Sequence, residues 1–298
     1  MRIVIAGGRG FLGTALRVVL QDAGYEVAVL TRRKQPGARE IRWDGATLGD
    51  WTEAISGSDA VVNACGYGLE HWPWTASQKR RFAASRVEPG RTLVAGIERA
   101  RHRPKLFVQF SGINLYGLQG ETPADEATGA AHDFLARLAV RWEAATEPVE
   151  TMGVRRVVVR NAIVLDRHEG LFPLMIMACR LFAGGRFGDG QQAVPWIHRH
   201  DQVMAIKRLL ESEGSRGPYN LVAPHAVANA EFMRSVCRGL GRPYWFHVPA
   251  FALRLVLGEM AVMILAGRAA QPKRLLEGGF QFAFPTLDAA LQDLFKSD

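Results

Sequence analysis

Short apolar runs alternate along the chain with longer segments whose apolar residues recur at helical spacing. Residues 2–6 are the first such run, rich in β-branched side chains, and they predict a buried strand. From Phe11 onward the apolar side chains fall on one helical face, and Gly24 ends that predicted helix. Further strands are predicted at 26–31, 41–43, 59–66, 106–110, 155–160 and 219–222, and helices at 51–55, 74–100 and 131–145. This alternation indicates an α/β fold of Rossmann type, a doubly wound parallel sheet with helices on both faces.

The pattern changes after Asn161. Residues 170–182 predict a helix, the glycines of 184–190 predict a flexible loop, and Asp201 is predicted to cap the next helix. The apolar stretch 251–265 contains Arg254 and Glu259, so it is too short and too charged to span a bilayer and predicts a core helix. We expect a nucleotide-binding domain at 1–165, to which segment 194–223 returns, and a smaller, helix-rich cap domain at 166–298.

Four glycines directly follow the first predicted strand: Gly7, Gly8, Gly10 and Gly13. In a strand–turn–helix context, the first permits a sharp turn, Gly10 lets the backbone approach a pyrophosphate, and Gly13 lets the helix pack close to the strand. The helix N-terminus then offers free N–H groups to phosphates. A tight turn alone explains one glycine, so the motif predicts a dinucleotide site.

The end of the second predicted strand indicates which dinucleotide binds. A site for NAD carries an acidic residue there, which accepts the ribose 2′-hydroxyl. This chain has Thr31, Arg32, Arg33 and Lys34 instead, and Arg9 in the glycine loop points to the same region. Cations suit a 2′-phosphate, so we expect NADP(H) rather than NAD(H). A solvated basic turn is the alternative, but it leaves the missing carboxylate unexplained.

Composition narrows the function classes. The chain has 298 residues, a formal net charge of +8 and only three cysteines, Cys65, Cys179 and Cys237, with no Cys-x-x-Cys. This scattered set argues for a reducing, cytoplasmic location and against a disulfide framework or a metal site. No signal peptide is expected. The basic charge could attract nucleic acid, but no nucleic-acid motif accompanies it. We therefore expect a small-molecule substrate, no nucleic-acid or membrane partner, and a monomer or homodimer.

Several stretches together resemble the extended short-chain dehydrogenases/reductases, and more narrowly the atypical epimerase family, which is nucleoside-diphosphate-sugar epimerase-like and has a distinctive C-terminal domain. The matching stretches are GGRGFLG, DAVVNACG, the Ser85-Arg86 pair, FLARLAVRWEAA, VVVRNAIVL, LFAGGRFGDGQQAVPWIH, VPAFALRLVLGEMA and QPKRLLEGGFQFAFPTLDAAL. The tail and the GGRFGDG…PWIH segment are the most specific of these, since the glycine motif alone selects only the superfamily.

The resemblance implies NADP(H) contacts along the carboxyl edge of the sheet. It assigns Gly7, Gly10, Phe11 and Leu12 to the pyrophosphate, and Thr31 and Arg32 to the adenosine phosphate. Ala64, Cys65, Gly66 and Arg86 would follow the ribose and diphosphate, and Phe110, Ser111, Asn161, Ala162 and Ile163 would approach the nicotinamide.

The proton relay of short-chain dehydrogenases is missing. They use a Tyr-x-x-x-Lys pair with a Ser or Thr, yet no Tyr in this chain is followed four residues later by Lys. Phe134 and Leu138 stand in the tyrosine and lysine positions, and Gly112 in that of the serine.

Two functions therefore stay open. The first is an oxidoreductase or epimerase acting on a small carbonyl or sugar-like substrate, with Ser111 and Tyr116 as catalytic candidates. His132, Asp133 and His198 are further local candidates, although a packed tyrosine, helix caps and a structural histidine are the simpler explanations of Tyr116 and these three. The second is a non-catalytic NADP(H)-binding redox sensor.

Overall fold

The computed structural model describes residues 1–118, 120 and 122–296, so the last two positions of the predicted cap domain lie outside it. In this described part of the chain, seven parallel strands form one sheet in the order β11-β6-β5-β4-β1-β2-β3. They are β1 (Arg2–Ala6), β2 (Glu26–Thr31), β3 (Glu40–Arg42), β4 (Ala60–Asn63), β5 (Leu106–Gly112), β6 (Arg155–Asn161) and β11 (Gly217–Leu221). The doubly wound fold predicted from the sequence is confirmed.

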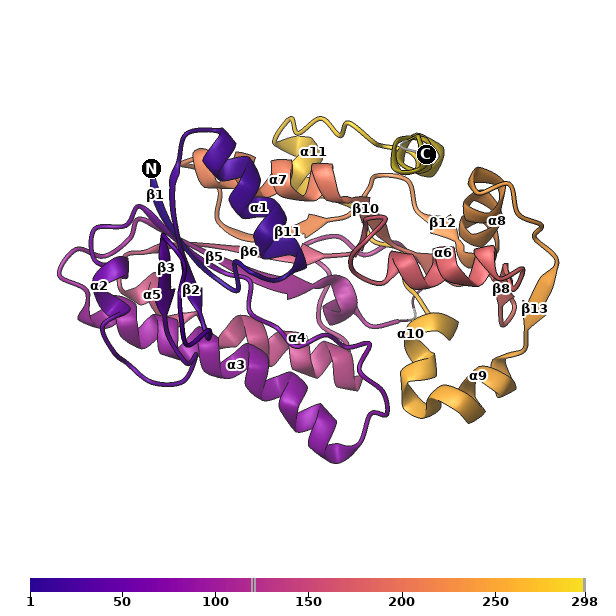
Figure 1. Cartoon of the computed structure of the whole chain (residues 1–298), viewed down its shortest axis with the longest axis horizontal. Helices are drawn as coiled ribbons and strands as arrows, with labels where there is room; N and C mark the ends of the chain where they lie inside the picture. The colour runs from indigo at the N-terminus through magenta and orange to yellow at the C-terminus, as the bar shows by residue number, and fades with distance from the viewer. Residues whose placement is uncertain (119, 121, 297–298) are drawn as a thin grey trace.

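Helices cover both faces of this sheet, which makes three layers (Figure 1). One face carries α1 (Phe11–Asp22), α7 (Arg199–Glu211) and α11 (Lys273–Glu277); the other carries α2 (Thr52–Ile55), α3 (Ala76–Arg99), α4 (Phe134–Ala144) and α5 (Pro148–Thr151). The short helix η1 (Ile113–Tyr116) follows β5.

Alternation along the strands builds two separate cores. Ile3 and Ile5 pack toward Leu16 of α1, whereas Val4 and Ala6 pack with Leu93 of α3. A strand buried on both faces explains why residues 2–6 read as one continuous apolar run rather than as an alternating pattern.

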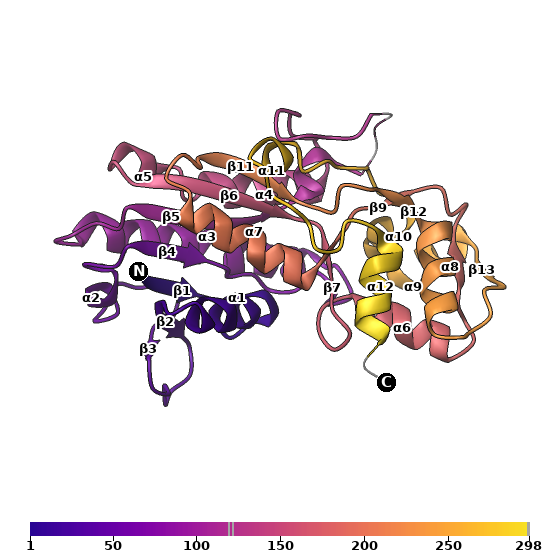
Figure 2. The same cartoon turned by 90° about the horizontal axis from the view of Figure 1, so that it is seen from above.

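The C-terminal region lies beyond the carboxyl ends of the strands (Figures 1 and 2). It has a third core, in which Phe172, Phe232 and Leu287 bring three helices together. Its elements are β7 (Ile163–Leu165), α6 (Phe172–Arg180), β8 (Gly185–Phe187), β9 (Ala193–Val194), β10 (Trp196–His198), β12 (Val227–Ala228), α8 (Asn229–Gly239), β13 (Phe246–Val248), α9 (Ala250–Leu257), η2 (Gly258–Ala261), α10 (Val262–Leu265) and α12 (Leu287–Phe295).

Three local predictions for this region are wrong. Helix α7 begins at Arg199 with His198 as its N-cap, because Asp201 is buried and accepts hydrogen bonds from the backbone N–H groups of Ala283 and Phe284 instead. The predicted flexible loop at 184–190 contains β8, which pairs with β13.

The predicted core helix at 251–265 is the third. The chain bends at Gly258, where φ is +56°, and every residue of α9 is exposed or half-buried. Leu255 is 84% exposed, so this apolar helix lies on the surface rather than in a core.

Candidate functional site

The glycine turn after β1 is closely packed against the end of β4. Gly7 has φ +81°, and a Cβ atom there would lie 2.7 Å from the carbonyl carbon of Ala64. A Cβ on Gly13 would lie 2.2 Å from the Gly7 carbonyl oxygen, so α1 could not approach the turn with any larger residue.

Gly10, by contrast, has open space where a side chain would project. It is the N-cap of α1 and makes no side-chain capping bond, and a Cβ there would meet only the Gly7 carbonyl oxygen, at 3.4 Å. The N–H groups of Phe11 and Leu12 belong to the first turn of the helix. This open helix N-terminus is suited to a pyrophosphate.

The strand ends bring the other predicted residues to the same edge of the sheet. Ala6 of β1 is level with Leu30 of β2 and with Asn63 of β4. Gly112 of β5 is level with Asn161 of β6. Thr31, the glycine turn, the Ala64–Cys65–Gly66 turn, Ser111 and Asn161 thus follow one another along one edge.

At the end of β2 the predicted phosphate-binding residues differ in environment. Thr31 is buried, whereas Arg32 and Arg33 are exposed. Arg9 forms an ion pair with Glu40, a carboxylate of β3 that the sequence did not single out. Arg9 is therefore already neutralised, and Arg32 is the better placed cation.

Arg86 is a buried cation beside the β4 turn. It is 7% exposed, and its guanidinium carbon would lie 3.5 Å from a Cβ on Gly66. Its Nη1 donates to the carbonyl oxygens of Tyr67 (2.8 Å) and Phe82 (3.2 Å). Across the residues that the structure describes, none of the carboxylates lies within ion-pair distance of it.

Burial lowers the pKa of Arg86 to about 10, and the more distant Glu70 offsets only part of that shift. A buried charge without a counter-ion is costly, and an anionic ligand at Gly66 would supply one. Burial raises the pKa of Cys65 in the same turn to about 12, so it is a thiol rather than a thiolate at neutral pH.

Behind the ends of β5 and β6 lies a buried polar network that the sequence did not predict. Ser111 Oγ is 2.7 Å from Glu143 Oε1. Arg160 donates to both carboxylate oxygens of Glu143 through Nε and Nη2, each at 2.9 Å. Because a carboxylate can only accept, the Ser111 hydroxyl proton is directed at Glu143, and Ser111 keeps only acceptor capacity for any other partner.

The Tyr116 hydroxyl belongs to the same network, and its proton is already used in a hydrogen bond. Its hydroxyl accepts from Arg160 Nη1 (2.8 Å) and donates to Asn220 Oδ1 (2.7 Å). Asn220 Nδ2 donates to the Gln271 carbonyl oxygen, which fixes the orientation of the amide. Tyr116 is 1% exposed and burial raises its pKa, so its surroundings are those of a structural tyrosine.

The remaining nicotinamide-side residues are also packed. Phe110 is buried in the core that α1 and α7 cover, and Asn161 Nδ2 donates to the Ser111 carbonyl oxygen at 3.1 Å. Ala162 and Ile163 are half-buried, and Ile163 begins β7, which pairs with β10.

The other local candidates have structural partners. Asp133 caps α4 by accepting from the Ala136 N–H, and His132 beside it is exposed. His198 Nδ1 accepts from the His200 N–H at the start of α7. Among the residues that the structure describes, no cluster of His, Cys, Asp and Glu could hold a metal ion.

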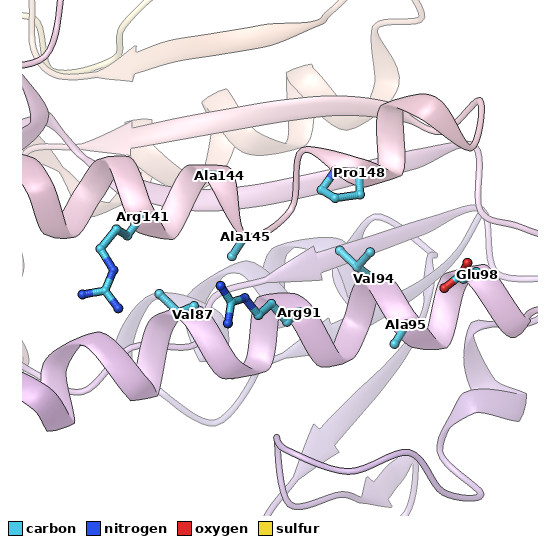
Figure 3. Close-up of a pocket in the computed structure, with 9 residues that line it drawn as sticks. All are labelled: Val87, Arg91, Val94, Ala95, Glu98, Arg141, Ala144, Ala145 and Pro148. Atoms are coloured by element: carbon cyan, nitrogen blue, oxygen red, sulfur yellow. The ribbon is translucent and has the colours of Figure 1, made fainter.

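A cavity of about 420 Å³ lies elsewhere, between α3 and α4 (Figure 3). Val87, Val94 and Ala145 line it together with Arg91 and Arg141, and it contains none of the predicted site residues. We therefore assign the candidate site to the carboxyl edge of the sheet rather than to this cavity.

A parallel sheet that reverses its strand order at a glycine turn, next to an open helix N-terminus, defines a Rossmann-type nucleotide-binding protein. Comparison with known proteins gives the family: the NAD dependent epimerase/dehydratase family matches residues 3–221, and a domain of unknown function (DUF1731) matches residues 248–294. The chain belongs to this epimerase family and carries its C-terminal domain.

Full-length relatives support that assignment. Epimerase family protein SDR39U1 of Bos taurus is 36% identical and is covered over 99% of both chains. Epimerase family protein YfhF of Bacillus subtilis is 33% identical over 99% of this chain and 98% of its own. The crystal structure of human SDR39U1 (isoform 2) with NADPH matches with a TM-score of 0.91 and 33% identity over 100% of both chains.

Proposed function

We propose that this protein binds NADP(H) across the carboxyl edge of its sheet. The observation that carries the proposal is the pairing of an open helix N-terminus at Gly10 with Arg86, a buried cation that lacks an anionic partner within the described chain. The exposed Arg32 at the end of β2 favours a 2′-phosphate over a free hydroxyl. The NADPH in the human SDR39U1 structure supports the same choice.

A side chain at Gly10 tests the pyrophosphate site. Gly10→Val has space within the protein, because its Cβ meets only one oxygen, at 3.4 Å, but it projects where the pyrophosphate would lie. We expect the variant to keep its Tm and to lose NADPH binding by at least tenfold in a calorimetric titration. Gly214→Val is the control, since a Cβ there has no neighbour within 4 Å. Unchanged NADPH affinity in Gly10→Val would contradict the proposed site.

For the reaction, the family favours hydride transfer, as an oxidoreductase or epimerase, on a small carbonyl or sugar-like substrate. NADP(H), when bound, supplies the hydride. The Rossmann domain would comprise residues 1–165 and the returning segment 194–223, and the C-terminal region would cover the substrate. Three free thiols support a reducing location such as the cytoplasm.

One observation favours a second function, a redox sensor that binds NADP(H) without turning it over. The Tyr116 proton is already donated to Asn220, and Ser111 donates its own to Glu143, so neither candidate holds a proton for a substrate. Incubating the NADPH complex with carbonyl compounds and sugar nucleotides separates the two functions. Loss of NADPH absorbance supports the enzyme, whereas a stable complex whose protein partners change with the redox state supports the sensor.

A further inference from the structure

Two of the three cysteines meet in the core of the C-terminal region. Cys179 lies on α6 and Cys237 on α8, both are 0% exposed, and their sulfur atoms are 2.9 Å apart. A disulfide bond brings two sulfurs to about 2.05 Å, so only a short movement separates this pair of thiols from a covalent bond. No local motif links the two cysteines, because 58 positions separate them in the sequence.

The backbone around the pair is built to admit both sulfurs. A Cβ on Gly184 would lie 2.3 Å from Cys237 Sγ and 3.1 Å from Cys179 Sγ, so any other residue there would displace them. The Gly184 carbonyl oxygen accepts from the N–H groups of Trp245 and Phe246, which ties the same turn to β13. The two sulfurs therefore sit where α6, α8 and the β8–β13 pair converge.

We propose that Cys179 and Cys237 are a site of reversible oxidative modification that closes to an intrachain disulfide. Burial raises the pKa of both thiols, so they stay protonated and shielded from bulky thiol reagents. The fitting oxidant is small and uncharged, of the peroxide class. This inference does not depend on the proposed cofactor or reaction.

The chemistry balances with hydrogen peroxide. One thiol gives up its proton as its sulfur attacks a peroxide oxygen; the O–O bond breaks, the departing hydroxide takes that proton as water, and a sulfenic acid forms. The second sulfur then attacks the sulfenic sulfur, the S–O bond breaks, and the second water leaves. The two thiols lose two electrons and two protons to the peroxide, and an added dithiol reverses the bond by exchange.

The bond would join two helices of the C-terminal region around a segment that passes through the main sheet. The chain between the two cysteines includes α7 and the sheet strand β11. Closing so long a loop restricts the unfolded chain, so the oxidised protein is expected to melt roughly 5 °C higher than the reduced one.

The test treats the intact protein with hydrogen peroxide, labels the remaining thiols with maleimide in denaturant, and maps the peptides by mass spectrometry. We expect a Cys179–Cys237 cross-linked peptide, no cross-link to Cys65, and a rise in Tm that dithiothreitol reverses. Cys179→Ser and Cys237→Ser are matched controls that should lose the cross-link and the rise. If these variants fold poorly, the peptide map of the peroxide-treated wild-type protein tests the proposal by itself. Maleimide on both residues, or separate sulfinic acids, would overturn the proposal.

Discussion

At the scale of single residues, Arg86 is the informative side chain of the candidate site. It lies in α3 over the ring of Trp142, at 4.9 Å, and against the turn at Gly66. Two backbone carbonyls satisfy part of the guanidinium but do not neutralise it. A ligand that brings negative charge gains more at such a position than at an exposed arginine, because water screens the exposed charge.

We predict that Arg86→Met weakens NADPH binding about tenfold, or about 1.4 kcal/mol. The ligand-free protein should lose little stability, since the lost hydrogen bonds are offset by removal of a buried charge. Calorimetric titration with NADPH and a melting curve measure the two effects. Arg91→Met, an exposed arginine on the same helix, is the control. A lower Tm with unchanged NADPH affinity would give Arg86 a purely structural role.

Arg32 should decide between the two dinucleotides. Arg32→Glu replaces a partner of the 2′-phosphate with a like charge, so it should weaken NADPH binding at least tenfold more than NADH binding. Arg101→Glu makes the same charge change at an exposed position in the turn that precedes β5, at the opposite edge of the sheet. Equal weakening of both cofactors by Arg32→Glu would remove the proposed role.

The residues that could not be predicted are those whose partners are distant in sequence. Glu143 and Arg160 form an ion pair between a helix and a strand, and neither has a local motif. Arg160 did carry a signal, because it directly follows three apolar residues of β6 in the sequence and is itself buried. An arginine inside such a strand needs a carboxylate, but the sequence does not say which one.

At the scale of elements, the glycine turn and the long strands were predictable because their patterns are local. Residues 2–13 hold a complete strand, turn and helix start. The short strands of the C-terminal region could not be predicted in this way. Strands β8 and β13 have three residues each, and they form by pairing with each other. The prediction for helix α9 failed for a different reason. Its apolar composition predicts burial, but the helix lies on the surface.

The junction of β10 and α7 gives a prediction about pH. Burial lowers the pKa of His198 from 6.5 to about 4, and the exposed Asp293, 3.4 Å from Nε2, counteracts this only in part. Neutral His198 therefore contributes stability that is present above about pH 6.5 and is lost as the pH falls toward 4. The shift corresponds to a loss of about 3 kcal/mol.

Melting curves across that window test the assignment. We expect the Tm of the wild-type protein to fall more steeply with acidification than that of His198→Gln. His102→Gln, at an exposed histidine, should follow the wild type. Parallel curves for the wild type and His198→Gln would mean that His198 does not carry the acid sensitivity.

At the scale of the whole molecule, the strand register brings the predicted cofactor residues to the carboxyl edge of the sheet. The C-terminal region lies beyond that edge (Figure 1). Within the described residues no helix is long and apolar enough to cross a membrane. The net charge of +8 agrees with a phosphate-rich ligand. For cofactor binding, however, the positions of Arg32 and Arg86 matter more than the net charge of the chain.

The measurement that tests the central claim most directly is a side-by-side titration of the purified protein with NADPH and NADH. The account predicts tight NADPH binding, with NADH weaker by at least tenfold, or about 1.4 kcal/mol. Equal affinities would contradict the phosphate site at Arg32. Failure to bind either cofactor would contradict the account as a whole, since the glycine turn and Arg86 would then have no anionic ligand.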